Sequence, residues 1–381
     1  MRILVVIGTR PEAIKMAPVI INLKKEFSSK NLKICVTAQH RKLLDDVLKF
    51  FKIKPDYDLN IMRYNQDLFD ISISIFEKLK FVLNKYKPNL VLVHGDTTTS
   101  MITSLAGFYK KIKIGHIESG LRTHNLFSPW PEECNRQITD LISSFHFAPT
   151  IEAKKNITKS RVRSDSLKIT GNTVIDALLY TKKEIQDNKK LHKSLINKFK
   201  YLNKSNRMLL VTCHRRENFG KGINALCNAL KDLIKKNNDL IIVFPVHPNP
   251  SIKKFVFKSL SKIKNIKLIE PVNYVSMVYL MINSYLIITD SGGLQEEAPS
   301  LNKPLLILRD ETERPEVIKL GAGKLIKKNK SNIILNIERL LYNKQLYKKM
   351  SVVKNPYGDG KASIRIIKTL KENRKVITGA P

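Results

Sequence analysis

Carboxylates in the first half of the chain stand at positions where α/β proteins commonly place their chemistry. Asp96 and Glu118 each follow a short apolar run directly, and Glu132 and Glu133 open a predicted helix after a polar loop. Carboxylates at different strand ends can converge on one ligand and move protons to and from it. This pattern predicts a site with several proton-handling groups.

Structural explanations compete with that interpretation. An Asp before a Thr-rich helix start is commonly a helix cap, which fits Asp96, and the helix dipole alone favours one of Glu132 and Glu133. Glu118 is harder to explain structurally, because a buried strand and glycines flank it. The pairs His94-x-Asp96 and His116-x-Glu118 resemble metal ligands, but no Pro-Cys-x-x-Cys accompanies them, so we expect no metal.

A second set of residues suits a ligand that carries phosphate. Residues 8–15 (GTRPEAIK) place Arg10 and Lys15 at a helix start after the first predicted strand, although an exposed Arg and a solvated Lys fit the local sequence equally well. Three later segments, residues 212–218, 289–298 and 309–316, also follow strands; between them they supply cations, a turn with free backbone N–H groups and a carboxylate that reaches ribose hydroxyls. The residues expected at the ligand there are His214, Ser291, Gly292, Gly293, Glu297 and Arg314.

Two nucleotide-binding motifs are absent from the sequence, and their absence limits the kinds of nucleotide that we expect as ligand. The sequence has neither the dinucleotide fingerprint G-x-G-x-x-G nor the phosphate loop G-x-x-x-x-G-K-[ST], which argues against a dehydrogenase and an ATPase. A nucleotide site without these loops is more typical of a sugar nucleotide. We therefore expect a nucleotide-sugar ligand and no cofactor.

The elements that position these residues follow a βαβ rhythm. Short, continuously apolar runs alternate with longer amphipathic stretches, which predicts parallel strands covered by helices on both faces. The runs are residues 3–7, 32–36, 90–93, 113–117, 167–170, 209–212, 240–244, 266–269, 286–289 and 304–308. The predicted fold class is α/β, with two Rossmann-like domains whose parallel sheets face each other across a cleft, as in the glycosyltransferase-B architecture.

A chain of 381 residues is too long for one ordinary core, so we expect two domains. The predicted boundary lies near residue 170. The first domain, residues 1–170, carries the acids and is joined in this prediction by the C-terminal helix 361–375. The second domain, residues 171–360, binds the nucleotide.

The net charge of +35 invites a nucleic-acid hypothesis, which the distribution of the charge does not favour. The excess lysines are scattered beside Asn and Ile on predicted helix faces and loops, so we expect no nucleic-acid partner. No apolar run reaches the length of a membrane span, and the first apolar segment reads as a strand instead of a signal. Four cysteines without paired spacing fit a reducing compartment, so we expect a soluble, cytoplasmic protein.

From residue 1 to about residue 375 the sequence resembles the bacterial non-hydrolysing UDP-N-acetylglucosamine 2-epimerases. The similar motifs are residues 8–15, 94–98 (HGDTT), 115–123 (GHIESGLRT), 131–133 (PEE), 171–173 (GNT), 214–217 (HRRE) and 290–293 (DSGG). Together they are highly specific.

The resemblance implies roles for individual residues. The catalytic groups would be Asp96, Glu118, Glu132 and His214. UDP would be bound by Arg10, His214, the turn Ser291-Gly292-Gly293, Glu297 and Arg314. Lys15 would reach toward the sugar, and Arg136 would also contact the substrate. The segment from Val272 to Met277 would lie beside uracil, and this chain has Met277 where an aromatic residue is usual. Some relatives bind a second substrate molecule as an activator at positions that correspond to Gln39, Gln66 and His247, but this chain has Asn65 where they carry an Arg, which leaves the activator site open.

The implied activity is reversible C2 epimerisation of UDP-N-acetylglucosamine to UDP-N-acetylmannosamine by elimination and re-addition of UDP, for surface-polysaccharide synthesis. The resemblance also implies a homodimer. A hydrolysing epimerase that releases N-acetylmannosamine and a glycosyltransferase are the alternative activities. A nucleotide-sensing or RNA-binding protein is the non-enzymatic alternative, and it rests on charge alone.

Overall fold

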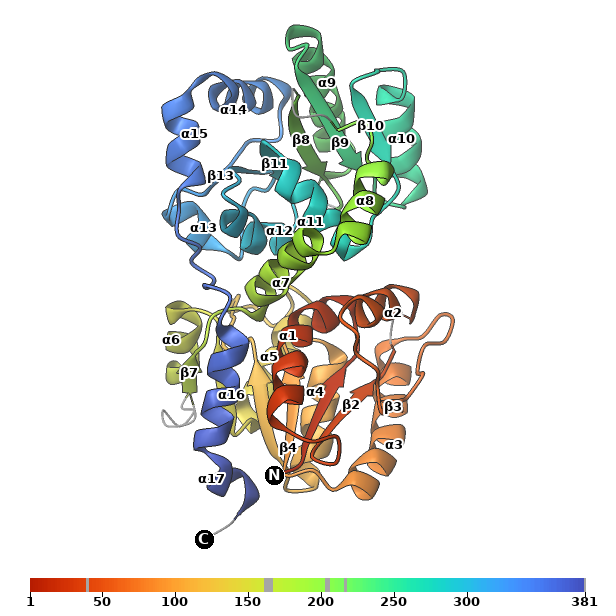
Figure 1. Ribbon diagram of the computed structural model, residues 1–381, viewed down its shortest axis with the longest axis vertical. Helices are drawn as coiled ribbons and strands as arrows, with labels where there is room; N and C mark the ends of the chain where they lie inside the picture. Colours follow the sequence, from red (N-terminus) through yellow and green to blue (C-terminus); the bar gives the residue numbers. More distant parts are fainter. Residues whose placement is uncertain (39–40, 161–166, 203–205, 216–217, 380–381) are drawn as a thin grey trace. The chain divides into compact units, whose positions relative to one another are not determined.

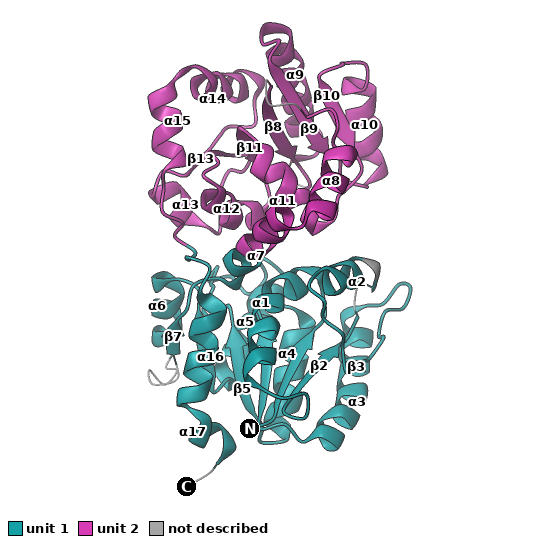
Figure 2. Cartoon of the chain, viewed as in Figure 1, with its two compact units in different colours: residues 1–177, 357–381 teal, residues 178–356 magenta. Residues whose placement is uncertain are grey.

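The computed structural model describes residues 1–38, 41–160, 167–202, 206–215 and 218–379. The chain divides into two compact units (Figure 2). Unit 1 contains Met1–Ala177 and Tyr357–Pro381, and unit 2 contains Leu178–Pro356.

Unit 1 is built on a parallel sheet that has seven strands among the described residues, in the order β3-β2-β1-β4-β5-β6-β7. Its strands are β1 (Ile3–Ile7), β2 (Leu32–Val36), β3 (Tyr57–Asp58), β4 (Leu90–His94), β5 (Lys113–Ile117), β6 (Phe145–Ala148) and β7 (Leu167–Ile169). All five residues of β1 and of β4 are buried. Strands that are apolar along their whole length require cover on both faces, which the helices of the unit supply.

The helices of unit 1 connect these strands as crossovers (Figure 1). They are α1 (Arg10–Glu26), α2 (Arg41–Phe50), α3 (Leu68–Tyr86), α4 (Thr98–Tyr109), α5 (Glu132–Ile142) and α6 (Ile151–Lys159), and α7 (Thr173–Asp187) leads from unit 1 into unit 2. Most of them begin with a side-chain cap; Thr97, for example, accepts a hydrogen bond from the Ser100 amide at the start of α4.

The end of the chain returns to unit 1 as α16 (Ala362–Glu372) and α17 (Arg374–Thr378), and α16 packs on α1 (Figure 1). Its first turn is held by buried Asp176, which accepts hydrogen bonds from the amides of Ala362 at 3.1 Å and Ser363 at 2.8 Å. Asn22 of α1 donates to the Ser363 hydroxyl at 3.0 Å. These contacts fix a helix that stands far from α1 in the sequence.

Unit 2 repeats the arrangement with a parallel sheet of six described strands in the order β10-β9-β8-β11-β12-β13. The strands are β8 (Arg207–Thr212), β9 (Leu240–Pro245), β10 (Ile266–Ile269), β11 (Leu286–Thr289), β12 (Leu305–Ile307) and β13 (Gly323–Leu325). Its helices are α8 (Lys189–Lys198), α9 (Lys221–Lys236), α10 (Pro250–Leu260), α11 (Tyr274–Asn283), α12 (Gly292–Glu297), the 3-10 helix η3 (Ala298–Leu301), α13 (Pro315–Lys319), α14 (Lys330–Tyr342) and α15 (Lys344–Ser351). One buried apolar cluster joins α9 and α14 to the central strands.

The fold class predicted from the sequence is confirmed: both sheets are parallel and covered by helices, and the structural neighbours described below share the glycosyltransferase-B-like fold. Every predicted run is a strand within one or two residues at each end. The short strands β3, β6 and β13 were missed, because β3 has two residues, β13 has three and begins with Gly323, and β6 carries His146 inside an otherwise apolar run. In the described part of the chain, no helix is long and apolar enough to span a membrane.

Candidate active site

In each unit several of the residues predicted to do chemistry follow strands at the carboxyl edge of the sheet, and some of them flank the point where the strand order reverses. This point is between β1 and β4 in unit 1 and between β8 and β11 in unit 2. The connection after β1 leads to Arg10 and that after β4 holds Asp96, while β8 is followed by His214 and β11 by Asp290. Ligands of open α/β sheets bind at such switch points, because the loops on either side of the reversal diverge and leave a crevice.

Glu118 follows β5 with its backbone in the left-handed region, at φ 65°. Its carboxylate is paired with the Lys15 ammonium of α1 and accepts a hydrogen bond from the Asn172 amide at 2.7 Å. The side chains of Glu118 and Lys15 are 9% and 12% exposed, so this is a largely desolvated ion pair. His94 lies beside it, with Nε2 at 3.8 Å from Glu118 Oε2. The structure thus brings Lys15, His94 and Asn172 to Glu118 from distant parts of the sequence.

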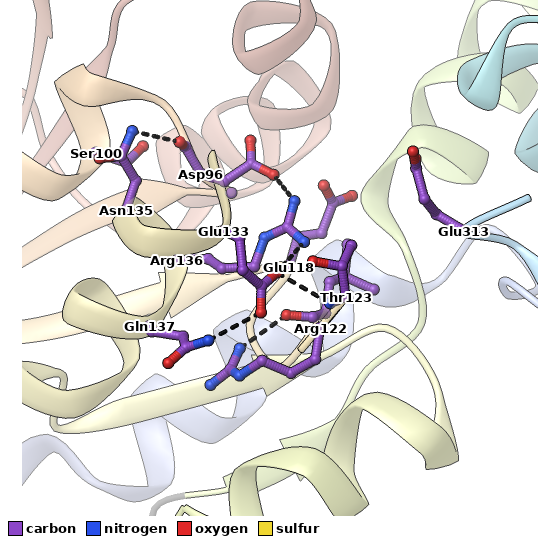
Figure 3. A network of polar contacts seen from close by, with 12 residues as sticks. Asp96, Ser100, Glu118, Arg122, Thr123, Glu133, Asn135, Arg136, Gln137 and Glu313 are labelled. Carbon is purple, nitrogen blue, oxygen red and sulfur yellow. Dashed lines mark hydrogen bonds and ion pairs between the residues drawn. The ribbon is translucent and has the colours of Figure 1, made fainter. Parts of the chain in front are cut away.

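Asp96 is paired with Arg136 of α5, and its backbone carbonyl accepts a hydrogen bond from the Asn135 side chain at 2.9 Å. The alternative role of Asp96 as a helix cap is wrong, because Thr97 caps α4. Figure 3 shows the Arg136 guanidinium lying between the carboxylates of Asp96 and Glu133. Burial acts to lower the pKa of Arg136, but the two carboxylates outweigh it and hold the pKa above its usual value.

The structure separates the roles of the two acids at the start of α5. Glu133 is fully buried and accepts hydrogen bonds from the Thr123 amide at 3.0 Å and from Gln137 at 2.9 Å, besides its ion pair with Arg136 (Figure 3). Burial acts to raise its pKa, but these partners together lower it. Glu132, the first residue of α5, is partly exposed and forms no hydrogen bond or ion pair with the residues that the structure describes. Glu133 is therefore structural, and Glu132 remains available to a ligand.

Arg10 begins α1 directly after Thr9, and Glu12 closes the first turn. Glu12 is buried and accepts from the amides of Gly8 at 3.1 Å and Thr9 at 2.7 Å, and from the Thr97 hydroxyl at 2.9 Å. It thereby ties the loop after β1 to the loop after β4. Its burial raises its pKa.

In unit 2, buried Asp290 organises the loop that carries His214. Its carboxylate accepts from the amides of His214 and Arg215, both at 2.9 Å, and from the Asn218 side chain at 2.8 Å, and it lies 2.9 Å from His214 Nδ1. Burial acts to raise the pKa of Asp290, but His214 and the other donors outweigh it and lower the pKa to about 2. The His214 side chain is 42% exposed, so its ring is oriented by Asp290 and accessible to a ligand.

The segment Ser291-Gly292-Gly293 lies beside Arg314, whose Nε is 2.8 Å from Glu296 Oε1. A Cβ atom added at Gly292 would stand 2.7 Å from the guanidinium carbon of Arg314, so any larger residue there would displace this cation from the turn. Glu297 is buried and accepts a hydrogen bond from the Tyr274 hydroxyl at 2.7 Å.

The predicted uracil-side residues, Val272 and Met277, flank the start of α11 and are both partly exposed.

The positions connected with an activator are only partly described. Of these, Gln39 lies outside the described residues, as do Arg216 and Glu217 of the 214–217 motif. Gln66 is bonded within its own loop to Arg63 and Ile61, and the ring of His247 stacks on that of His214 with centroids 6.5 Å apart. Sequence reasoning gave Asn172 and Asp290 only as parts of motifs, and their contacts appear only in the fold.

No group of three or more His, Cys, Asp or Glu side chains among the described residues could hold a metal ion. The candidate residues of unit 1 are mainly carboxylates, and those of unit 2 are mainly cations and a glycine turn.

Two parallel sheets with ligand-type residues at their switch points define an α/β protein of the glycosyltransferase-B type. A family model described as UDP-N-acetylglucosamine 2-epimerase matches residues 23–371. The UDP-N-acetylglucosamine 2-epimerase of Campylobacter jejuni is 51% identical over 373 residues, which cover 97% of both chains, and that of Escherichia coli K12 is 49% identical over 98% of this chain and 99% of its own. The chain belongs to the UDP-N-acetylglucosamine 2-epimerase family, a family of isomerases, as the resemblance predicted.

Among solved structures, UDP-GlcNAc 2-epimerase from Neisseria meningitidis bound to UDP-GlcNAc matches with a TM-score of 0.90 and 48% identity. The match covers 98% of this chain and all of that one.

Proposed function

We propose that the protein is a non-hydrolysing epimerase that interconverts UDP-N-acetylglucosamine and UDP-N-acetylmannosamine. The observation that carries this proposal is the near-complete match to the Neisseria meningitidis enzyme bound to UDP-GlcNAc, at a TM-score of 0.90. The carboxylates at the switch point of unit 1 and the cations at that of unit 2 supply the two kinds of group that the reaction requires.

The chemistry explains why several acids are needed. The C2 hydrogen of the sugar is not next to a carbonyl group, so a carboxylate cannot remove it directly. When the C1–O bond breaks and its electron pair leaves with UDP, positive charge at C1 acidifies this hydrogen. A carboxylate then takes the proton, the C1=C2 bond of a 2-acetamidoglucal forms, and UDP adds back while a proton reaches the opposite face of C2. Two faces require two proton-handling groups.

Unit 1 supplies these groups in the proposal. Asp96, Glu118 and Glu132 handle protons at C2, with Asp96 and Glu118 held in place by Arg136 and Lys15. The partly exposed Glu132, which has no partner among the described residues, supports a role at the ligand. Lys15 and Arg136 also approach the sugar, because they stand at the same edge as the acids that they bind.

Unit 2 supplies the binding site for UDP. Arg314, His214 and the Ser291-Gly292-Gly293 turn stabilise the leaving diphosphate, where negative charge develops, and Arg10 of unit 1 contributes a further cation. Glu297 and the segment from Val272 to Met277 bind the nucleoside. The glycine at position 292, which admits the Arg314 guanidinium, supports a phosphate at this turn.

The test is to incubate the purified protein with UDP-N-acetylglucosamine alone and to follow the anomeric protons by NMR. We expect UDP-N-acetylmannosamine to accumulate to an equilibrium that is reached from either substrate. Free N-acetylmannosamine and UDP would assign the protein to hydrolysing epimerases, and turnover only with an added acceptor sugar would indicate a glycosyltransferase.

The same proposal includes a homodimer, which is supported by an apolar face on unit 1. Phe69 and Ile73 of α3 are 78% and 56% exposed and lie on the same side of the helix as Phe76, whose ring stacks on Tyr109 of α4. Phe108 and Tyr109 of α4 are 54% and 68% exposed. Contiguous exposed apolar side chains are typical of a protein interface, and a second copy of the chain is the occupant that we assign.

Light scattering after size-exclusion chromatography tests this interface. Phe69→Asp with Ile73→Asp should convert a dimer to a monomer. Phe81→Asp is the matched control, because Phe81 is also exposed on α3 but lies about 120° around the helix from Phe69. A monomeric wild type, or a dimer that survives the double change, would contradict the assignment.

The cytoplasm is the compartment that we propose for this activity. Cys35, Cys213 and Cys227 are buried free thiols, and burial raises the pKa of Cys227 to about 12. Buried thiols that stay protonated are compatible with a reducing compartment.

A further inference from the structure

A buried carboxylate outside the predicted site, Asp140, connects the loops that carry two of the predicted acids. It lies near the end of α5, and its side chain has no exposed surface. One carboxylate oxygen is 2.6 Å from His116 Nδ1. The other is 2.6 Å from the Arg122 guanidinium and accepts from the Gly120 amide at 3.3 Å.

His116 extends this contact to Asp96. It lies in β5 with no exposed surface, and its Nε2 is 2.8 Å from the carbonyl oxygen of Gly95. The Gly95 amide in turn donates to the Ile117 carbonyl at 2.9 Å. Both polar groups of the Gly95 backbone are therefore bonded to β5, and the peptide group that leads into Asp96 is fixed.

Both partners of the His116 ring offer acceptor oxygens. The Gly95 carbonyl lies at Nε2 and the Asp140 carboxylate at Nδ1. Burial acts to raise the pKa of Asp140, but His116 and then Arg122 outweigh it and hold the pKa below its usual value. The ring therefore bridges the Asp140 carboxylate and the Gly95 backbone.

The same carboxylate restrains the turn that carries Glu118. His116, Gly120 and Arg122, all bonded to Asp140, stand on both sides of Glu118 in the sequence. The turn is tight, because a Cβ atom at Gly120 would lie 2.2 Å from the Ala153 carbonyl oxygen. Neither Glu118 nor Asp96 touches Asp140 itself in any contact that the structure describes.

We infer that Asp140 and His116 are positioning residues for the proposed epimerisation: one buried pair of side chains, in contact at 2.6 Å, holds the backbone of the Asp96 loop and the backbone of the Glu118 turn in register. The inference rests on the proposed function, because it assumes that these two acids handle protons at the substrate. Both act through the backbone of other residues and touch no substrate. Misplacement of a catalytic group by about 1 Å can cost on the order of 100-fold in rate.

A neighbouring histidine provides a matched control. His146 is the partner of His116 in the register of β5 with β6, has no exposed surface, and also contacts Asp140, through Nε2 and the backbone carbonyl at 2.7 Å. It has no described bond to the Asp96 loop or the Glu118 turn. Replacing it removes a buried imidazole from the same layer of the sheet without breaking the connection.

The experiment compares His116→Phe with His146→Phe in steady-state epimerisation. For His116→Phe we expect kcat to fall about 100-fold, with UDP affinity by calorimetry within about twofold of the wild type. For His146→Phe we expect kcat within about threefold of the wild type. Circular dichroism and thermal melting report whether each variant is folded.

Two polar variants separate the two bonds of the ring. In His116→Gln the amide nitrogen takes the place of Nε2 and can still donate to Gly95. In His116→Asn it takes the place of Nδ1 and leaves the Gly95 carbonyl unpaired. We expect the Gln variant to retain at least about tenfold more kcat than the Asn variant, since a lost hydrogen bond to a buried acceptor corresponds to about that factor.

Equal losses in His116→Phe and His146→Phe, or a loss of UDP affinity as large as the loss of kcat, would overturn the positioning role while the epimerase function stands. If His116→Phe does not fold, the Gln and Asn variants decide: a slower Asn variant supports the inference and equal rates refute it. A wild type that forms no epimer would refute the proposed function, and the positioning role with it.

Discussion

In unit 2 the charge of Asp290 should be the main electrostatic stabilisation of the loop after β8 that carries His214. The substitution Asp290→Asn tests this. The substitution keeps the size of the side chain and removes its charge. The carboxylate accepts from three donors at 2.8–2.9 Å and orients His214, and its pKa is about 2 against an ordinary value of 3.8. Each pKa unit corresponds to about 1.4 kcal/mol, so the ionised form stabilises the folded loop by roughly 2 to 3 kcal/mol, or on the order of 50-fold in an opening equilibrium.

Hydrogen exchange of a peptide that covers residues 208–215 measures this local opening directly. Global unfolding would not report it cleanly, because a chain of two units need not unfold in one step. The exchange protection of this peptide at pH 7 should fall on the order of 50-fold in Asp290→Asn. Because the pKa is lowered in the folded state, the stabilisation is present above the unfolded pKa and is lost as pH falls from about 4 toward about 2. UDP affinity should fall as well, since His214 loses the partner that orients its ring.

Asp239→Asn is the control for the same peptide. Asp239 pairs with Arg207 at the start of β8, but its side chain is 45% exposed, so the pair is screened by solvent. The control should reduce protection less than about fivefold. Equal protection in the two variants, or an Asp290→Asn variant that is as protected as the wild type, would refute the account of Asp290.

Three further predictions concern the proposed reaction. Asp96→Asn, Glu118→Gln and Glu132→Gln should each lower kcat strongly and leave UDP affinity nearly unchanged, whereas His214→Ala should weaken both; carboxylate variants that lose UDP binding but turn over normally at saturation would show that the acids are misassigned. In D2O the product should carry deuterium at C2, and substrate with heavy oxygen in the bridge between the sugar and the β-phosphate should scramble that label by NMR and mass spectrometry; retained hydrogen with an unscrambled bridge would exclude elimination. Gly292→Ala should weaken UDP binding on the order of tenfold by displacing the Arg314 guanidinium, while Gly293→Ala, whose added Cβ has no neighbour closer than 3.9 Å, should bind UDP normally in calorimetry.

Much of the fold was predictable because local sequence and burial agree along most strands. β1 is apolar throughout, and β4 and β8 are apolar over residues 90–93 and 208–211; a strand buried on both faces in a parallel sheet requires this pattern. β6 was not predicted because His146 interrupts its apolar residues. The burial of this histidine is explained by its contact with the Asp140 carbonyl, which only the structure shows.

The candidate site was predictable as a set of residue types at strand ends, but not as a set of partners. The sequence marks Glu118 as an acid with no evident structural reason, because its neighbours are a buried strand and glycines. It cannot show that Lys15 and Asn172 meet this carboxylate, since 103 and 54 positions separate them along the chain. It also presents His116 as one half of a metal-like pair, whereas the fold surrounds its ring with an acceptor at each nitrogen.

The sequence by itself therefore determined the two parallel sheets, the strand ends that carry chemistry and the family. Periodicity, glycine and proline positions and short motifs are local properties, and they need no knowledge of distant contacts. Only the tertiary structure decided that α16 returns to α1, that Thr97 and not Asp96 caps α4, and that Glu133 is buried while Glu132 is partly exposed. Those outcomes depend on which side chains satisfy buried donors and charges across long separations, and that is settled by packing once the sheets have formed.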